Sequence, residues 1–136
     1  PGKQAVFELR QRHRDRHDLL LLFSSYWDGP APNPGRSDLV QTAVGHACEF
    51  ETSMMLRIAP QLVVGDLSKI PEVPFGNAFA PGSRAWITKD RTEAGHIGDP
   101  RWATAEKGET IFSAFAESVV TYMERVVRWD GKHWDG

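Results

Sequence analysis

The residues best suited to chemistry are one histidine and the two carboxylates that follow it closely. His46 stands directly after a glycine, and Glu49 and Glu51 come within the next five residues. Histidine gains and loses a proton near neutral pH, so a histidine beside carboxylates and helix N-terminal amides is suited to acid–base chemistry. On residue types alone, the simpler alternative is a loop histidine followed by two carboxylates that cap a helix.

A second candidate site residue, Trp27, follows an apolar run. Residues Leu19–Phe23 are continuously apolar and lead into Ser24–Asp28, which include Trp27. A continuous rather than alternating apolar run is typical of a strand in a parallel sheet covered on both faces. Ligands of open α/β sheets bind outside the carboxyl ends of the strands, so this pattern places Trp27 at a ligand site.

Two other patterns have structural interpretations. His13 and His17 lie one helical turn apart, but Arg14 stands where a zinc-protease helix carries its glutamate. We therefore interpret both as surface histidines. Cys48 is the single cysteine of the chain, so no internal disulfide can form. This cysteine usage predicts a reducing, cytoplasmic compartment.

The apolar periodicity predicts three helices around one buried strand. The first helix runs from Lys3 to about Arg14, and the second, from Glu49 to Ile58, ends before a proline. The third spans about Thr104 to Val127, where Thr104 can act as the N-cap. A proline-containing loop is expected from Gly29 to Gly35. For the long segment rich in glycine and proline, about residues 65–98, we expect a functional loop, an interface element or a segment disordered on its own.

Composition predicts one soluble globular domain, and the order of its elements favours the α/β class. A chain of 136 residues with 40% hydrophobic residues can bury a single core. Its net charge of −2 favours neither nucleic acid nor an anionic membrane as a partner. The longest apolar run, Leu19–Phe23, is far shorter than the roughly 20 residues that span a bilayer. A helix followed by a buried strand is half of a βαβ unit.

Four blocks of the sequence resemble the creatininase family, in family order and over nearly the whole chain. Gly45–Leu56 is similar to the family's histidine-containing Glu-Thr-Ser signature, and Gly98–Gly108 resembles the Gly-Asp-Pro-x-x-Ala-Thr-Ala-Glu-Lys-Gly motif that leads into its last helix. Ser25–Asp28 resembles the family's strand end before the active-site loop. Ala59–Val63 resembles the helix exit after the Glu-Thr-Ser element.

The resemblance implies a three-layer α/β/α sandwich with a mostly parallel sheet. It also implies two divalent ions, zinc, manganese or iron, that support hydrolysis of an amide C–N bond. His46 matches the histidine that moves a proton to the leaving nitrogen. Trp27 matches an aromatic wall of the substrate pocket. Glu51 is the carboxylate of the Glu-Thr-Ser element, which binds a metal or orients a residue that does. Cys48 is expected to be a packing residue, because water is the attacking group in this family.

The chain departs from the family pattern in two places. Creatininase itself carries Trp-Asp-x-Glu-His to hold creatinine, whereas this chain has Thr42–His46 in that place, so we do not identify it as creatininase. The family's early Glu-x-His, a nearby Asp and its Asn-Gly-His motif are absent. We therefore expect residues 1–136 to be the C-terminal part of a single amidohydrolase domain, inactive alone. Most metal ligands would lie in the missing N-terminal part.

Several functions remain open from the sequence. The first is a metal-dependent amidohydrolase acting on a small cyclic amide, a formamide or a peptide-like substrate. The second is a peptidase that trims a cofactor-precursor peptide. The third, from a different class, is a non-catalytic half-domain that pairs with a separate chain or serves in assembly. We also expect a homo-oligomer, with neither nucleic acid nor membrane as a partner.

Overall fold

The computed structural model describes residues 2–29, 38–74, 76 and 78–133. Its elements in chain order are α1 (Gly2–Arg12), α2 (Glu49–Ile58), the 3-10 turns Pro60–Leu62 and Leu67–Lys69, α3 (Thr88–Arg91), the 3-10 turn Pro100–Trp102, and α4 (Ala105–Arg128). The three predicted helices are therefore confirmed, the second with the predicted bounds. The loop predicted for Gly29 to Gly35 lies, beyond Gly29, outside the described residues. No helix in the described part of the chain is long and apolar enough to cross a membrane.

The long helix α4 is built as its sequence predicts. The Thr104 side chain accepts a hydrogen bond from the Lys107 amide at 3.1 Å and so caps the helix N-terminus. Ile111 and Phe115 are 0% and 3% exposed, so the first half of the apolar stripe faces a core. Val127, near the other end, is 80% exposed. The stripe is thus buried over only part of its length.

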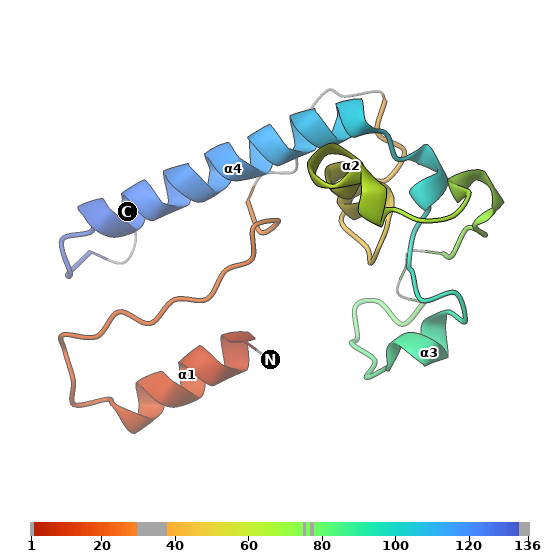
Figure 1. Cartoon of the computed structure of the whole chain (residues 1–136). Helices are drawn as coiled ribbons and strands as arrows, with labels where there is room; N and C mark the ends of the chain where they lie inside the picture. Colours follow the sequence, from red (N-terminus) through yellow and green to blue (C-terminus); the bar gives the residue numbers. More distant parts are fainter. Residues whose placement is uncertain (1, 30–37, 75, 77, 134–136) are drawn as a thin grey trace.

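The core lies where α2 crosses the N-terminal half of α4 (Figure 1). A Cβ on Gly108 of α4 would come within 2.0 Å of the Ser53 carbonyl oxygen of α2, so the backbones approach closely there. The Ser53 hydroxyl accepts a hydrogen bond from the Thr104 amide at 3.2 Å. The apolar side chains that fill this crossing are Leu39, Cys48, Phe50, Met54, Ile111 and Phe115.

The predicted sheet is not confirmed. Leu19–Phe23 is extended but carries no strand pairing with the described residues, and Leu22 and Phe23 are each 47% exposed. The β-pairings found among the described residues are two isolated antiparallel bridges, between His46 and Ile97 and between Val73 and Gly98. A central parallel strand needs a neighbour on each side for its backbone hydrogen bonds. The described residues contribute no such neighbour.

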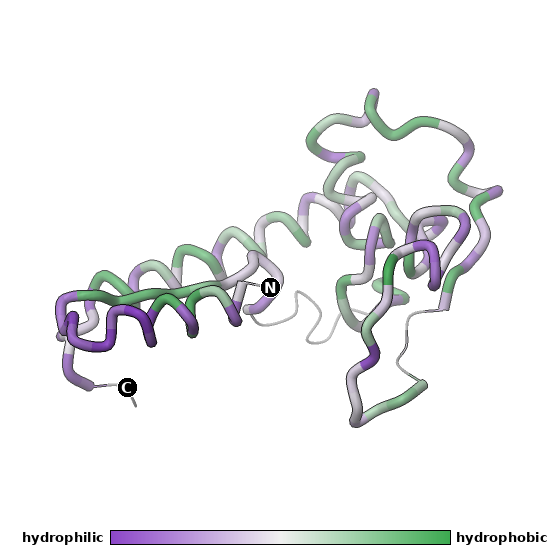
Figure 2. Tube along the Cα trace, turned by 90° about the horizontal axis from the view of Figure 1, so that it is seen from below, coloured by the Kyte–Doolittle hydropathy of each residue, from purple (hydrophilic) through white to green (hydrophobic). Residues whose placement is uncertain are grey.

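The extended segment after α1 instead runs along α4 in the opposite direction (Figure 1). Leu20 and Leu22 line a pocket together with Tyr122 of α4, and the Tyr26 and Phe115 rings lie 5.3 Å apart between centroids. Figure 1 shows the extended segment, in orange, between α1 and α4, and Figure 2 shows its hydrophobic character in green. No residue of α1 is buried. The apolar face predicted for the first helix is therefore not buried by any of the described residues.

Candidate functional site

His46 sits on a backbone held by the loop that precedes α4. Its amide donates to the Ile97 carbonyl at 3.0 Å, and the Ile97 amide donates back to the His46 carbonyl at 2.7 Å. The next residue, Ala47, has a φ of +47°. This left-handed backbone costs a non-glycine residue on the order of 1–2 kcal/mol. The chain thus turns sharply between His46 and the start of α2, and the His46 side chain is left exposed.

Glu51 and Thr52 hold this sharp turn from the first turn of α2. The Glu51 Oε2 atom accepts a hydrogen bond from the Ala47 amide at 2.6 Å. The Thr52 hydroxyl donates to the Ala47 carbonyl at 3.3 Å. Both backbone polar groups of Ala47 are therefore engaged by side chains of the Glu-Thr-Ser element. In this structure, the carboxylate predicted as a metal ligand fixes the turn that presents His46.

Glu49 has a different environment from Glu51. It is 0% exposed, and its Oε2 atom accepts hydrogen bonds from the Val40 and Gln41 amides at 2.9 and 2.8 Å. Its Oε1 atom is 2.6 Å from the Lys107 ammonium, which also donates to the Trp102 carbonyl at 2.6 Å. The Lys107 side chain is only 12% exposed. Glu49 is therefore a structural residue that joins α2 to α4.

His46 and Glu51 line the same pocket. It has a volume of about 420 Å³ and lies between the N-terminal turn of α2, the segment after α2, and the loop before α4. The other polar side chains that line it belong to Thr52 and His96. Most of its wall is apolar, formed by Ala47, Met55, Val63, Leu67, Ile70, Ala94 and Pro100. The structure thus brings two of the three predicted site residues together in a largely apolar pocket.

His96 is a site residue that the sequence analysis missed. It is 5% exposed, and its Nε2 atom lies 2.7 Å from the Pro71 carbonyl oxygen. A carbonyl oxygen only accepts, so the Nε2 atom carries the hydrogen of this contact. The signal for it was its place two residues before the Gly98–Gly108 block. His96 and Pro71 are 25 residues apart in the sequence, so no local pattern reveals their contact.

Trp27 is not among the described residues that line this pocket. Its ring packs edge to face on Tyr26, with centroids 4.6 Å apart, and it is 44% exposed. Burial raises the pKa of the Tyr26 phenol, and the negative charge of Glu51 raises that pKa further. Tyr26 therefore contacts Trp27 and lies within electrostatic range of Glu51. The role of Trp27 as a substrate wall stays a prediction.

The described residues do not by themselves form the metal centre that the resemblance implies. Over these residues, no group of three or more His, Cys, Asp or Glu side chains is placed to hold one ion. A stable zinc site needs about three or four protein ligands. His46, His96 and Glu51 share a pocket but do not make such a set. A metal role for Glu51 stays a prediction.

The sequence and the fold both match proteins of one family. The Creatininase family profile, described as creatinine amidohydrolase, matches residues 1–123. The mycofactocin precursor peptide peptidase of Mycolicibacterium smegmatis is 35% identical over 96 residues, which cover 66% of this chain and 35% of that protein. The chain thus spans about a third of the length of this curated relative.

Solved structures agree with the sequence comparison. A putative creatinine amidohydrolase from Bacteroides fragilis superposes with a TM-score of 0.65 at 22% identity, over 96% of this chain and 51% of that one. A mutant creatininase described as the Zn-Zn type superposes with a TM-score of 0.59 at 27% identity, over 93% of this chain and 50% of that one. These neighbours support an α/β fold of which the chain spans about half. The chain therefore belongs to the creatininase family.

Proposed function

We propose that the protein hydrolyses an amide C–N bond, with His46 as the group that transfers a proton. The observation that carries the proposal is the pocket that His46 and Glu51 both line, because these residues come from the block that resembles the family signature. Amide hydrolysis breaks the C–N bond only when the leaving nitrogen is protonated. The exposed side chain of His46 and its fixed backbone support this role.

The proposed role of Glu51 follows from its bond to the Ala47 amide. By holding the turn, it sets where the imidazole stands relative to the substrate carbonyl. Displacements on the order of 1 Å can cost about a hundredfold in rate, so this positioning matters for turnover. The family implies divalent metal, zinc, manganese or iron, which would activate water and polarise the carbonyl. We propose that most of its ligands lie outside residues 1–136.

A peptide is the substrate class that the comparisons favour within this function. The relative at 35% identity is named a precursor peptide peptidase. The largely apolar pocket beside His46, about 420 Å³, has room for an apolar side chain next to the scissile bond. Thr42–His46 lacks the residues that hold creatinine in creatininase. A peptidase acting on a precursor peptide is therefore our second, narrower proposal.

Substitution of His46 in the complete enzyme tests the proposal. We expect His46→Ala to lower kcat by about 10²–10⁴-fold, the usual contribution of a positioned acid or base, while metal content stays unchanged. His46→Gln should behave alike, because glutamine keeps hydrogen-bonding capacity but transfers no proton at neutral pH. The measurement is amine release from a panel of peptides and a formamide, and ring opening of creatinine, with metal content by elemental analysis.

His13→Ala is the matched control, because His13 is exposed beyond the end of α1. It should leave kcat unchanged. Glu51→Gln separates two roles: rate loss with metal retained indicates positioning of the turn, and loss of both indicates a metal ligand. Full activity of His46→Ala would refute the proposed role of His46, and the family match would then support only the fold.

A further inference from the structure

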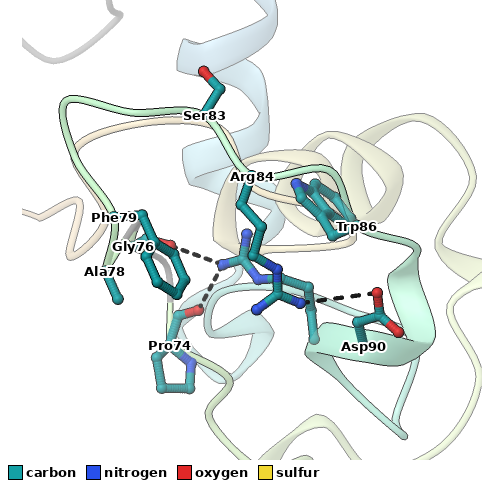
Figure 3. Close-up of a pocket in the computed structure, with 9 residues that line it drawn as sticks. Pro74, Gly76, Ala78, Phe79, Ser83, Arg84, Trp86 and Asp90 are labelled. Carbon is teal, nitrogen blue, oxygen red and sulfur yellow. Dashed lines mark hydrogen bonds and ion pairs between the residues drawn. The ribbon is translucent and has the colours of Figure 1, made fainter.

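A second pocket lies in the segment between residues 74 and 91, away from His46. It has a volume of about 730 Å³ and is lined by both Arg84 and Arg91; Figure 3 shows the Arg84 side chain at its centre. Phe79 and Trp86 form aromatic walls, and Asp90 contributes the one acidic side chain among the described lining residues. The described linings of this pocket and of the His46 pocket share no residue. It is therefore a separate site.

Arg91 is fixed in place by neutral groups of the described part of the chain. Its Nη2 atom donates to the Gly76 carbonyl at 3.1 Å and to the Pro74 carbonyl at 3.4 Å. Its guanidinium carbon lies 5.1 Å from the centre of the Trp86 ring. Carbonyl and ring contacts orient a guanidinium without neutralising it. Arg91 is thus a preorganised cation on the pocket wall.

Arg84 is only loosely paired. Its Nη2 atom is 3.8 Å from Asp90 Oδ2, a longer separation than a charge-assisted hydrogen bond. The same carboxylate oxygen accepts the Ile87 amide at 3.2 Å, so Asp90 is held at the start of α3. Two guanidinium groups and one carboxylate give the described lining about one net positive charge. That charge matches a monoanion better than a dianion.

We propose that this pocket binds a monoanionic carboxylate carried on a planar, apolar body. Guanidinium groups match carboxylate geometry with paired N–H donors, and here two of them line one pocket. Phe79 and Trp86, with Pro74 and Ala78, supply flat apolar surface for the rest of the ligand. Binding would also relieve the repulsion between the two like charges. Because no described lining residue is shared with the His46 pocket, this site stands independently of the proposed hydrolysis.

Titration with three related probes tests the assignment. Benzoate carries one negative charge, benzamide is its neutral analogue, and phenyl phosphate approaches two negative charges near neutral pH. We expect saturable binding of benzoate by calorimetry, at least tenfold tighter than that of benzamide and tighter than that of phenyl phosphate. Equal binding of benzamide would overturn the charge argument. Tighter binding of phenyl phosphate would overturn the choice of carboxylate, and absence of saturable benzoate binding would overturn the site.

Three variants locate the binding. Arg84→Met should weaken benzoate by at least tenfold, because it removes one of the two guanidinium groups that would pair with the carboxylate. Asp90→Asn keeps a capping side chain for α3 and removes the negative charge, so it should tighten benzoate by up to about fivefold. Lys89→Gln is the matched control, because this charge lies on α3 outside the described lining. Unchanged affinity in Arg84→Met, or an equal loss in Lys89→Gln, would refute the proposal.

Discussion

The crossing of α2 with α4 and the N-terminal segment, residues 2–29, use apolar residues in opposite ways. At the crossing, Ile111 and Phe50 are 0% and 1% exposed, and a buried ion pair joins the two helices. In the N-terminal segment, Leu22 and Phe23 are each 47% exposed and α1 buries no residue. Both regions have strong apolar patterns. They differ in whether the partner surface lies within the described residues.

This difference shows that an apolar run specifies burial only where a partner is present. Both sides of the crossing are present among the described residues, because the two sequence blocks that resemble the family pack against each other. Glu49 pairs with Lys107, and Ser53 contacts Thr104 and Gly108. The run Leu19–Phe23 lies beside α4 but pairs with no strand among the described residues. The chain spans about half of the solved relatives that it matches.

The largest expected effects lie at the crossing, and the buried ion pair is one of them. Glu49→Gln should cost about 3–5 kcal/mol in the free energy of unfolding, because it leaves the Lys107 ammonium buried beside a neutral amide. The glutamine carbonyl can still accept the Val40 and Gln41 amides, so the loss reports the charge. Urea unfolding measures it. Glu51→Gln is the control, because the Glu51 side chain is partly exposed, and it should cost less than about 1 kcal/mol. Equal losses in the two variants would contradict the structural role of Glu49.

A smaller effect is expected where the helix backbones meet. Gly108→Ala should destabilise by about 1–3 kcal/mol, because its Cβ would overlap the Ser53 carbonyl oxygen and force α2 outward. This loss would appear although alanine favours a helix over glycine by about 1 kcal/mol. Ser113→Ala, on the exposed face of α4, is the control and should stay within about 0.5 kcal/mol. A stabilising Gly108→Ala would mean that the helices do not approach as described.

Replacing an apolar side chain should destabilise the protein less in the N-terminal segment than at the crossing. Leu22→Ser should cost about 1 kcal/mol or less, because nearly half of the side chain is already exposed and full burial of a leucine contributes only about 1.5–3 kcal/mol. Phe115→Ala, at 3% exposed, should cost about 3–5 kcal/mol in the same urea unfolding experiment. A loss at Leu22 as large as that at Phe115 would break the comparison between the two regions.

The smallest effect concerns an exposed pair in the N-terminal segment. Two hydrogen bonds from Arg16, at 2.6 and 2.5 Å, lower the pKa of Asp18 to about 2. Because this pKa is depressed in the folded state, any stabilisation is present above the unfolded pKa and is lost as pH falls toward 2. Arg16→Gln should return the pKa of Asp18 to about 4, as followed by NMR titration. Unfolding in urea should not change measurably, since both side chains are largely exposed.

Local sequence patterns predicted the helices and the place of the candidate site. The bounds of α2, the Thr104 cap of α4 and the position of His46 before a helix follow from periodicity and capping, which act over a few residues. The α/β class came from the apolar run and the family resemblance. The sheet itself could not be tested by local signals, because a strand's pairing depends on residues far away in the chain or outside it.

The sequence by itself determined that Glu49 and Glu51 lie on different faces of one helix, because residues two apart are about 200° apart around a helix axis. It did not determine which of the two is buried. That was decided by Lys107, which lies 58 residues from Glu49 in the sequence and 2.6 Å from it in space. The same holds for His96 and Pro71, which are 25 residues apart, and for Arg91 and Gly76, which are 15 residues apart. A side chain's partner, and with it the side chain's role, depends on which distant segments the fold brings within hydrogen-bonding distance.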